Sequence, residues 1–215
     1  MHVTNCYIKS IKKKSMKRIA LTIMSLVLVL MMQAQNATQL LDKSAATLRA
    51  AGNVKIGFTM KAADGEQTGY IKLQKQKFVL NMGGTITWFD GKTMWTYVKV
   101  NEEVNVTTPS ASAVAKMNPY SFLSFYKNGY TAKMGKGSAS EHEVLLTGKE
   151  GASYKTAVVR LNKKTNYPTS ITMTTPKDVT TTIVCNSVLK NQKYNDATFR
   201  FNKKNYPNVE VVDLR

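Results

Sequence analysis

Apolar and polar residues alternate along most of the chain. In residues 54–61 every second side chain is apolar and the positions between are polar or glycine, which predicts a strand that is buried on one face only. The same period of two recurs in short segments at residues 69–75, 78–82, 86–88, 94–98, 143–149, 154–162, 169–175, 179–189 and 197–202. Strands therefore dominate the predicted structure.

Tight-turn signals separate many of these segments. Asp64-Gly65, Gly83-Gly84 and Asp90-Gly91 supply residues that adopt the positive φ of two-residue hairpin turns. Helices do not alternate with the strands, as they would in a parallel sheet. We therefore expect a mainly β (α+β) fold, in which about 10–11 antiparallel strands form one sheet that is strongly curved or partly closed.

Two segments have the period of a helix instead. Residues 36–51 carry apolar side chains at spacings of three and four, and Gly52 ends this pattern. Residues 109–128 form a second helical interruption, in which Asn118 and Pro119 suit an N-cap and the first helical position. Apolar side chains of this second segment include Val114, Met117, Phe122 and Phe125.

The first 35 residues have the composition of a secretory signal peptide. They contain six basic residues and no acidic one, and an apolar stretch of fourteen residues spans positions 19–32. That stretch is shorter than the roughly 20 residues of a membrane-spanning helix, although an N-terminal anchor is the alternative. Met16 suits the true start, and Ala34 and Ala37 suit cleavage sites. Because no cysteine follows the apolar stretch, we expect an exported periplasmic protein that is not itself lipidated.

The remaining residues 36–215 are expected to form one domain. They carry 25 basic and 13 acidic residues, hence a net charge of +12, with His142 and Cys185 as the only histidine and cysteine. One residue of each type cannot build a Cys/His zinc site, a disulfide or a redox pair. The lysines are spread over many segments, which does not favour nucleic-acid binding.

Catalytic motifs are weak. His142 between two glutamates suits a hydrated turn better than a hydrolase triad, and Glu102-Glu103 suits a solvated face better than an acid–base pair. Cys185 lies in a predicted strand, where a packed and inert thiol is favoured over a nucleophile. We therefore expect no enzyme, no metal and no cofactor, with a hydrolase as the weakest alternative.

Large apolar side chains are more numerous than a simple sheet face requires. Periodicity alone favours a sealed core slightly over a cavity that the segment 109–128 covers. Lys75 favours the cavity. Alternation places it on the face of Ile71 and Leu73, where a buried ammonium group without a partner is costly, so the mouth of an open cavity suits it better than a sealed core. The alternative is that the strand has frayed by residue 75 and that Lys75 is solvated. Flexible methionines at positions 60, 82, 94 and 117 suit an adaptable cavity. The candidate lining residues are Phe58, Leu73, Phe78, Leu80, Met82, Ile86, Trp88, Trp95, Phe122 and Phe125, and the candidate lid or gate residues are Lys75, Met117 and Pro119.

One segment carries a family resemblance. Residues 89–97, Phe-Asp-Gly-Lys-Thr-Met-Trp-Thr-Tyr, resemble the most recognisable hairpin of periplasmic outer-membrane lipoprotein carrier proteins of the LolA type. Residues 69–78, the Asn118-Pro119 pair, the Phe199-Arg-Phe201 triplet and residues 207–211 are similar to further family elements, so the likeness spans residues 37–214. The resemblance implies an unclosed β-barrel with a helical lid over an apolar cavity. It also implies that Lys75 occupies the position of an arginine that bonds to the lid.

The resemblance implies a function that requires no catalytic group. A carrier of this family binds lipoprotein acyl chains and shuttles lipoproteins from the inner to the outer membrane. Its expected partners are acylated lipoproteins, an inner-membrane releasing transporter and an outer-membrane acceptor, and we expect a monomer. The alternatives are a lipid- or lipopeptide-binding sensor or envelope factor of the same fold, and a structural β module without a ligand.

A first prediction concerns the N-terminus. Residues 1–35 should be absent from the exported protein, because the basic, apolar and small residues from Met16 to Ala37 follow the order that signal peptidase requires. N-terminal sequencing of protein from the cell envelope tests this. A mature N-terminus before Met32 would contradict it.

Overall fold

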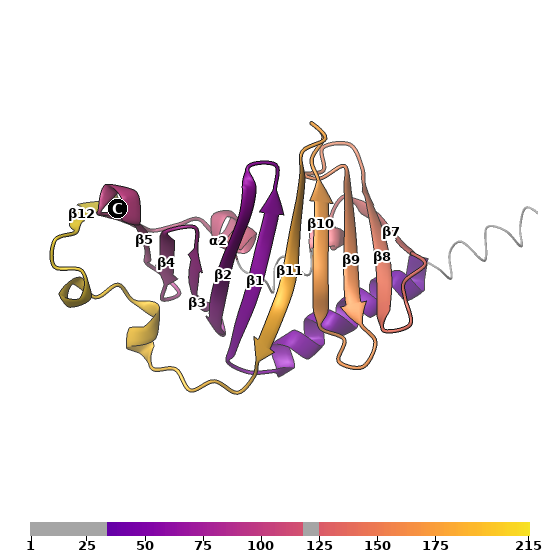
Figure 1. Cartoon of the computed structure of the whole chain (residues 1–215), viewed down its shortest axis with the longest axis horizontal. Coiled ribbons are helices and arrows are strands. Elements are labelled where there is room, and N and C mark those ends of the chain that lie inside the picture. Colours follow the sequence, from indigo (N-terminus) through magenta and orange to yellow (C-terminus); the bar gives the residue numbers. More distant parts are fainter. Residues whose placement is uncertain (1–33, 118–124) are drawn as a thin grey trace, which may run out of the picture.

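The computed structural model describes residues 34–117 and 125–215, and within them twelve strands form one sheet (Figure 1). The strand order is β12-β6-β5-β4-β3-β2-β1-β11-β10-β9-β8-β7. Every neighbouring pair is antiparallel except β12 and β6, which are parallel. The strands are β1 (Val54–Ala62), β2 (Gly65–Gln74), β3 (Lys77–Met82), β4 (Thr85–Phe89), β5 (Met94–Val98), β6 (Glu103–Thr107), β7 (Tyr130–Met134), β8 (Glu141–Gly148), β9 (Thr156–Asn162), β10 (Pro168–Thr174), β11 (Thr180–Leu189) and β12 (Glu210–Asp213).

Short helical elements interrupt the strands. A helix covers residues 34–50, and Gly52 just beyond its end has a φ of 71°, the left-handed conformation common after a helix. The other elements are the 3₁₀ helix η1 (Lys99–Asn101), the α-helix α2 (Ala111–Met117) and the 3₁₀ helices η2 (Phe125–Lys127), η3 (Asp196–Phe199) and η4 (Lys203–Asn205).

The predicted fold class is confirmed: the protein is mainly β, with an N-terminal helix and one curved sheet that stays open between β12 and β7. The predicted strand number was low because β6 and β12 were not recognised. The strand predicted at residues 197–202 was wrong. The Asn195 side chain caps η3 there by accepting a hydrogen bond from the backbone N–H of Thr198 at 3.0 Å, which favours a helical turn over an extended chain.

The N-terminal helix fills part of the concave face. In Figure 1 it runs diagonally across β8–β11. Its buried side chains, spaced by three and four residues, join those of β8, β9 and β10 in the main core cluster. Each fully buried leucine stabilises the fold by about 1.5–3 kcal/mol relative to an exposed one. The helix residues involved are Ala37, Leu41, Ala45, Leu48 and Ala51.

Two glycines allow close packing where the sheet bends. The pairing of β1 with β11 shifts register between Gly57 and Phe58, and such a bulge increases the local twist. A Cβ on Gly57 would lie 2.8 Å from Oγ of Ser187. A Cβ on Gly69 would lie 2.4 Å from the carbonyl oxygen of Asn81 and 3.0 Å from the ring of Phe58. Glycine at position 69 therefore makes room for the Phe58 ring on the concave face.

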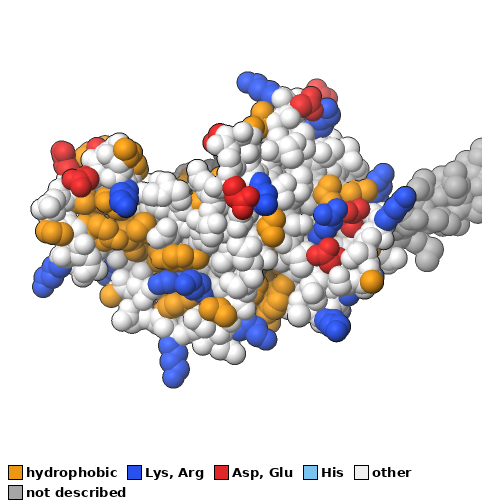
Figure 2. All heavy atoms as spheres, viewed as in Figure 1, with side chains coloured by type: hydrophobic (Ala, Val, Ile, Leu, Met, Phe, Trp, Pro, Cys, Tyr) orange, Lys and Arg blue, Asp and Glu red, His pale blue; other side chains and the backbone are white. Residues whose placement is uncertain are grey.

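The C-terminal segment, residues 190–213, covers the opposite face of β3–β6. Figure 1 shows it leaving the end of β11 and passing along this half of the sheet to β12. Hydrophobic side chains gather at this end of the molecule in Figure 2, whereas basic side chains are scattered over the whole visible face. Two small core clusters hold the segment, and their members include Val79, Trp88, Val104, Val106, Phe199 and Val209.

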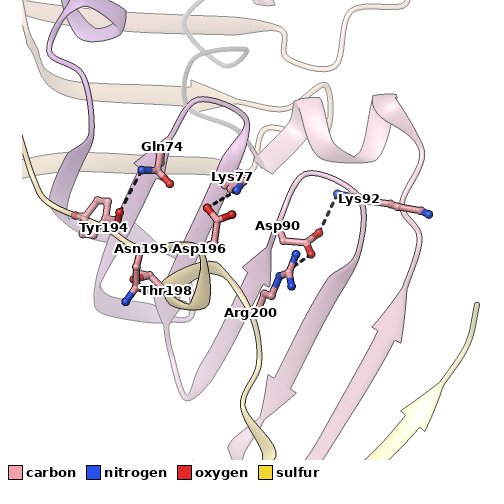
Figure 3. Close-up of polar contacts among 9 residues, drawn as sticks. All are labelled: Gln74, Lys77, Asp90, Lys92, Tyr194, Asn195, Asp196, Thr198 and Arg200. Atoms are coloured by element: carbon pink, nitrogen blue, oxygen red, sulfur yellow. Dashed lines mark hydrogen bonds and ion pairs between the residues drawn. The ribbon is translucent and has the colours of Figure 1, made fainter.

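Polar contacts fasten this C-terminal segment to two hairpin turns (Figure 3). Nζ of Lys77 lies 2.6 Å from Oδ1 of Asp196. Oδ1 of Asp90 accepts hydrogen bonds from the backbone N–H groups of Lys92 and Thr93 at 3.0 and 2.9 Å. Its Oδ2 lies 3.1 Å from Nε of Arg200. The recognisable Asp-Gly-Lys-Thr motif thus has a structural role, since Asp90 both shapes its own turn and holds the C-terminal segment.

The second prediction tests this role of Asp90. Asp90→Ala should lower the free energy of unfolding by about 2 kcal/mol, because it leaves two backbone N–H groups without their charged acceptor. Arg200→Ala should cost less than about 1 kcal/mol, because the arginine side chain is largely exposed. Urea titrations followed by tryptophan fluorescence measure both, since Trp88 lies in the adjoining cluster.

The control for this experiment is Lys61→Ala, which removes an exposed ion pair with Glu66 on a different hairpin. It should change the free energy of unfolding little. Equal effects of Asp90→Ala and Lys61→Ala would contradict the structural role of Asp90.

Candidate functional site

An apolar cavity lies on the concave face of the sheet. The cavity has a volume of about 410 Å³ and lies against β1, β2, β3, β10 and β11, beside the part of the face that the N-terminal helix fills. Leu48 of the helix and Met117 of α2 contribute to its wall. The remaining lining residues are Ile56, Phe58, Met60, Ile71, Leu80, Met82, Tyr154, Pro168, Ile171, Met173, Thr181, Ile183 and Cys185.

The cavity wall contains no charged side chain among the described residues. Its polar side chains are those of Tyr154, Thr181 and Cys185. Burial raises the pKa of the Cys185 thiol to about 11, so the thiol stays neutral and unreactive at pH 7. An enclosure of this kind can accept an uncharged apolar chain, whereas an ionised group inside it would lose its hydration without a compensating partner.

Methionine is the characteristic residue of the cavity. Three of the four methionines predicted as adaptable fillers, Met60, Met82 and Met117, line it. Met94 does not, and lies in the sealed core instead. Sequence reasoning missed Met173, which faces the cavity because it pairs with Thr181 across β10 and β11. The alternation in residues 169–175 defined two faces for that strand, and only the pairing showed which face is the concave one.

The structure brings four predicted site residues together at the cavity: Phe58, Leu80, Met82 and Met117. Leu73 and Phe78 lie on the same face of the sheet but are fully buried in the main core, where they do not border the cavity. The sequence left open whether the concave face is a sealed core or a cavity, and the structure contains both. The concave face is sealed over part of its area and hollow over the rest.

The prediction that Ile86, Trp88 and Trp95 line the cavity was wrong, because they lie on the convex face of the sheet. Trp88 pairs with Val79 and with Trp95, and all three side chains pack with the C-terminal segment on the convex side. The reason is the two-residue turn between β3 and β4. Such a turn pairs even-numbered with odd-numbered residues, so Ile86 and Trp88 point away from Leu80 although their numbers are all even.

Lys75 was also misplaced. β2 ends at Gln74, and Lys75 is an exposed turn residue with a φ of 55°, outside the cavity wall. The pairing of Gln74 with Lys77 leaves only two residues for the turn, so alternation does not extend to Lys75. The alternative of a solvated strand end is the correct one. Pro119 and Phe122 lie outside the described residues.

The segment 109–128 contributes two described elements near the cavity. In α2, Val114 packs against the main core and Met117 lines the cavity while remaining 41% exposed. In η2, the ring of Phe125 stacks edge to face with Tyr130 and with Tyr154, at centroid distances of 4.9 and 6.0 Å. Because Tyr154 also lines the cavity, this segment touches its wall from both described ends.

Asp42 of the N-terminal helix holds η2. The hydroxyl of Tyr126 donates a hydrogen bond to Oδ1 of Asp42 at 2.8 Å, and Nζ of Lys127 lies 2.7 Å from the same oxygen. These bonds from Lys127 and Tyr126 lower the pKa of Asp42. Burial and the same hydrogen bond hold the pKa of Tyr126 well above its usual value. We call this contact of Asp42, Tyr126 and Lys127 the Asp42 latch.

An open, curved sheet around an apolar cavity is the architecture of a class of binding and carrier proteins. The profile of one such family, described as outer membrane lipoprotein carrier protein LolA, matches residues 27–177, most of the chain. The chain belongs to this family, as a divergent member. The family is one of periplasmic lipoprotein-sorting proteins. No curated protein sequence matches the chain.

Solved structures share the fold at low sequence identity. An uncharacterised conserved protein from Thermus thermophilus has a TM-score of 0.57 at 12% identity, over 83% of this chain and 99% of that one. A putative outer membrane lipoprotein-sorting protein domain from Vibrio parahaemolyticus has a TM-score of 0.44 at 11% identity, over 78% and 97%. A chain of the Pseudomonas aeruginosa MucA/MucB complex has a TM-score of 0.46 at 12% identity, over 79% and 62%. The first of these supports the fold assignment.

Residues 34–117 and 125–215 offer neither a metal centre nor a membrane-spanning helix. No three His, Cys, Asp or Glu side chains come together there as ligands of a metal would. In the same residues, no helix has the length and hydrophobicity needed to cross a membrane.

The third prediction concerns the Asp42 latch. Asp42→Ala should leave the buried Tyr126 hydroxyl without its acceptor and lower the free energy of local opening by about 1–3 kcal/mol. Hydrogen exchange of a peptide spanning residues 125–134 should accelerate accordingly. In the unsubstituted protein the latch should hold from pH 7 down to about 4. Because the pKa of Asp42 is lowered below 3.8 in the fold, its contribution is lost as pH falls through that lowered value.

Asp178→Ala is the matched control, since it removes an exposed aspartate that is paired with Lys155 on another hairpin. It should not change exchange at residues 125–134. Unchanged exchange in Asp42→Ala would show that the latch does not hold η2.

Proposed function

We propose that this protein is a periplasmic carrier that binds the acyl chains of lipoproteins in its apolar cavity and shuttles lipoproteins from the inner to the outer membrane. The observation that carries the proposal is the cavity itself, which is uncharged over its described wall and about 410 Å³ in volume, in a chain of the lipoprotein carrier family. The ligand is the acyl part of the lipoprotein, because the wall offers apolar surface and few polar partners.

The energetics favour such a carrier. Each CH₂ removed from water contributes about 0.8 kcal/mol, so a lipoprotein anchor has a large cost in an aqueous compartment and needs an apolar enclosure. Release at the acceptor requires that the enclosure adapts. Unbranched methionine side chains rearrange easily, and Met60, Met82, Met117 and Met173 supply four of them to the wall.

The location and partners follow from this role. Residues 1–35 direct export and are removed, so the protein works in the periplasm. It acts there as a monomer and carries no lipid anchor of its own. It receives its cargo from an inner-membrane releasing transporter and delivers it to an outer-membrane acceptor. The segment 109–128 acts as a lid, with Met117 at the cavity edge and the Asp42 latch at the other end. Pro119 is a gate residue of this lid, and Phe122 contacts the bound chain from it, whereas Phe125 stacks on the cavity residue Tyr154 without lining the cavity itself.

One observation favours a second candidate function. A volume of about 410 Å³ lies within the roughly 300–1,000 Å³ of pockets that hold one small ligand. A sensor or envelope factor that binds a single lipid or lipopeptide would use the same wall. Native mass spectrometry of protein purified from its host separates the two, since triacylated lipoprotein cargo is expected only for the carrier.

The fourth prediction uses two adjacent residues of β11. Ile183 lines the cavity, whereas Val184 pairs with Thr59 and Ser170 and points to the opposite face. Ile183→Asn should weaken binding of a fluorescent palmitoyl probe at least ~10-fold, because it leaves an amide facing the bound chain. Val184→Asn is the matched control and should bind like the parent. Affinity of the parent should rise about fourfold for each CH₂ added to the chain, until the cavity is full.

Lipoprotein transfer between membranes should follow the same order as probe binding. Equal affinities of the Ile183 and Val184 variants would mean that acyl chains do not bind in this cavity. Saturable probe binding without any lipoprotein transfer would favour the second candidate function.

A further inference from the structure

Methionine is concentrated at the cavity. Of the eleven methionines in the sequence, six fall in the described part of the chain. Four of these six line the cavity: Met60, Met82, Met117 and Met173. Of the other two, Met94 is buried in the main core and Met134 is half-buried against it, and neither lines the cavity. The ligand-binding wall is therefore also the place where the described thioethers gather.

The four thioethers differ in their access to water. Met117 is 41% exposed at the edge of the cavity, Met60 and Met82 are half-buried, and Met173 is 5% exposed. A water-soluble oxidant therefore reaches Met117 first, Met60 and Met82 next, and Met173 last. The order of access therefore runs from the exposed Met117 to the buried Met173.

We propose that the methionines of this cavity are an oxidative modification site, and that their conversion to methionine sulfoxide expels the acyl ligand. The proposal rests on the proposed acyl-binding function. The oxidant is a hydroperoxide, with hydrogen peroxide as the simplest. The thioether sulfur donates an electron pair to one peroxide oxygen, the O–O bond breaks, an S=O bond forms and water leaves. Sulfur loses two electrons and the peroxide gains them.

The geometry explains why sulfoxide would oppose binding. A sulfoxide oxygen is a strong hydrogen-bond acceptor, and the described wall offers it only the donors of Tyr154, Thr181 and Cys185. Water satisfies the oxygen while the cavity is empty, whereas an acyl chain displaces that water. Oxidation thus makes the wall more polar and leaves the sulfoxide oxygen without a hydrogen-bond donor when an acyl chain is bound.

The modification is reversible in chemical terms. Methionine sulfoxide is reduced by two classes of reductase, one for each sulfoxide epimer. Met117 is accessible to such an enzyme in the folded protein, whereas Met173 is not. The structure therefore predicts that oxidation restricted to the outer methionines is repaired, and that oxidation reaching Met173 persists.

The experiment compares the probe affinity of each protein before and after treatment with hydrogen peroxide. Differences in starting affinity between the variants therefore do not affect the comparison. All proteins carry Cys185→Ala, which removes thiol oxidation. Peptide mapping by mass spectrometry gives the order of oxidation, circular dichroism monitors the fold, and a fluorescent palmitoyl probe gives affinity. The test variant replaces the four cavity methionines by leucine, and the control variant carries Met94→Leu and Met134→Leu. A Met60→Leu/Met82→Leu double variant replaces the test variant if that one does not fold.

We expect oxidation to weaken probe binding at least tenfold in the parent and in the control variant, and less than twofold in the test variant. The double variant should show an intermediate loss. Reductase treatment after mild oxidation should restore binding. The proposal is overturned if the parent binds equally well after Met60, Met82 and Met117 are oxidised, if the test variant loses as much affinity as the parent, or if the loss coincides with unfolding. If the parent does not bind the probe before oxidation, the proposed acyl-binding function itself is contradicted.

Discussion

The structure depends on how the concave face of one curved sheet is covered. Twelve strands in a single open sheet expose an apolar concave face that one helix cannot cover completely. The N-terminal helix packs on the β8–β10 half through Leu41, Ala45 and other small or branched side chains. Near β1–β3 and β11 the helix contributes only Leu48 to the cavity wall. The cavity is the part of the face that the helix leaves uncovered, with the segment 109–128 at its edge.

The opposite face of the sheet is covered near β3–β6, beside the region of the cavity. The C-terminal segment buries Trp88 and Phe199 behind the β3–β6 half of the sheet, and the ion pairs of Asp90 and Lys77 hold it there. These strands are therefore packed on both faces over part of their area. The convex clusters add buried contacts behind β3–β6, whereas most of the cavity wall comes from β1, β2, β10 and β11. The most recognisable sequence motif of the chain belongs to this support and not to the ligand site.

A carrier must bind an apolar chain strongly and then release it. Burial of CH₂ groups provides the binding energy, and a wall without charges imposes no directional requirement on the ligand. Release requires elements that can rearrange, and the cavity has flexible methionines in its wall and the proposed lid segment at its edge. The same methionines make the site chemically sensitive, because the thioether that adapts to an acyl chain is also the side chain that peroxide oxidises.

Much of this protein could be predicted from local pattern. The period of two defined the strands, the spacing of residues 36–51 defined the helix, and the Asp-Gly-Lys-Thr hairpin indicated the family. Phe58, Leu80, Met82 and Met117 were found because they belong to the apolar faces of strands or of the helical segment 109–128. Alternation within a strand, however, only divides its residues into two sets.

Which set faces the cavity is decided by pairing across turns and between distant strands. The two-residue turn after Met82 places Trp88 on the convex side, and the short turn after Gln74 removes Lys75 from the concave face. Met173 and Ile183 reach the cavity through the pairing of β1 with β11, more than a hundred residues apart in the chain. The sequence by itself determined the elements and their apolar faces, because those depend on neighbours a few residues away. Only the tertiary structure decided which faces enclose the cavity, because that depends on register between segments that meet only in the folded chain.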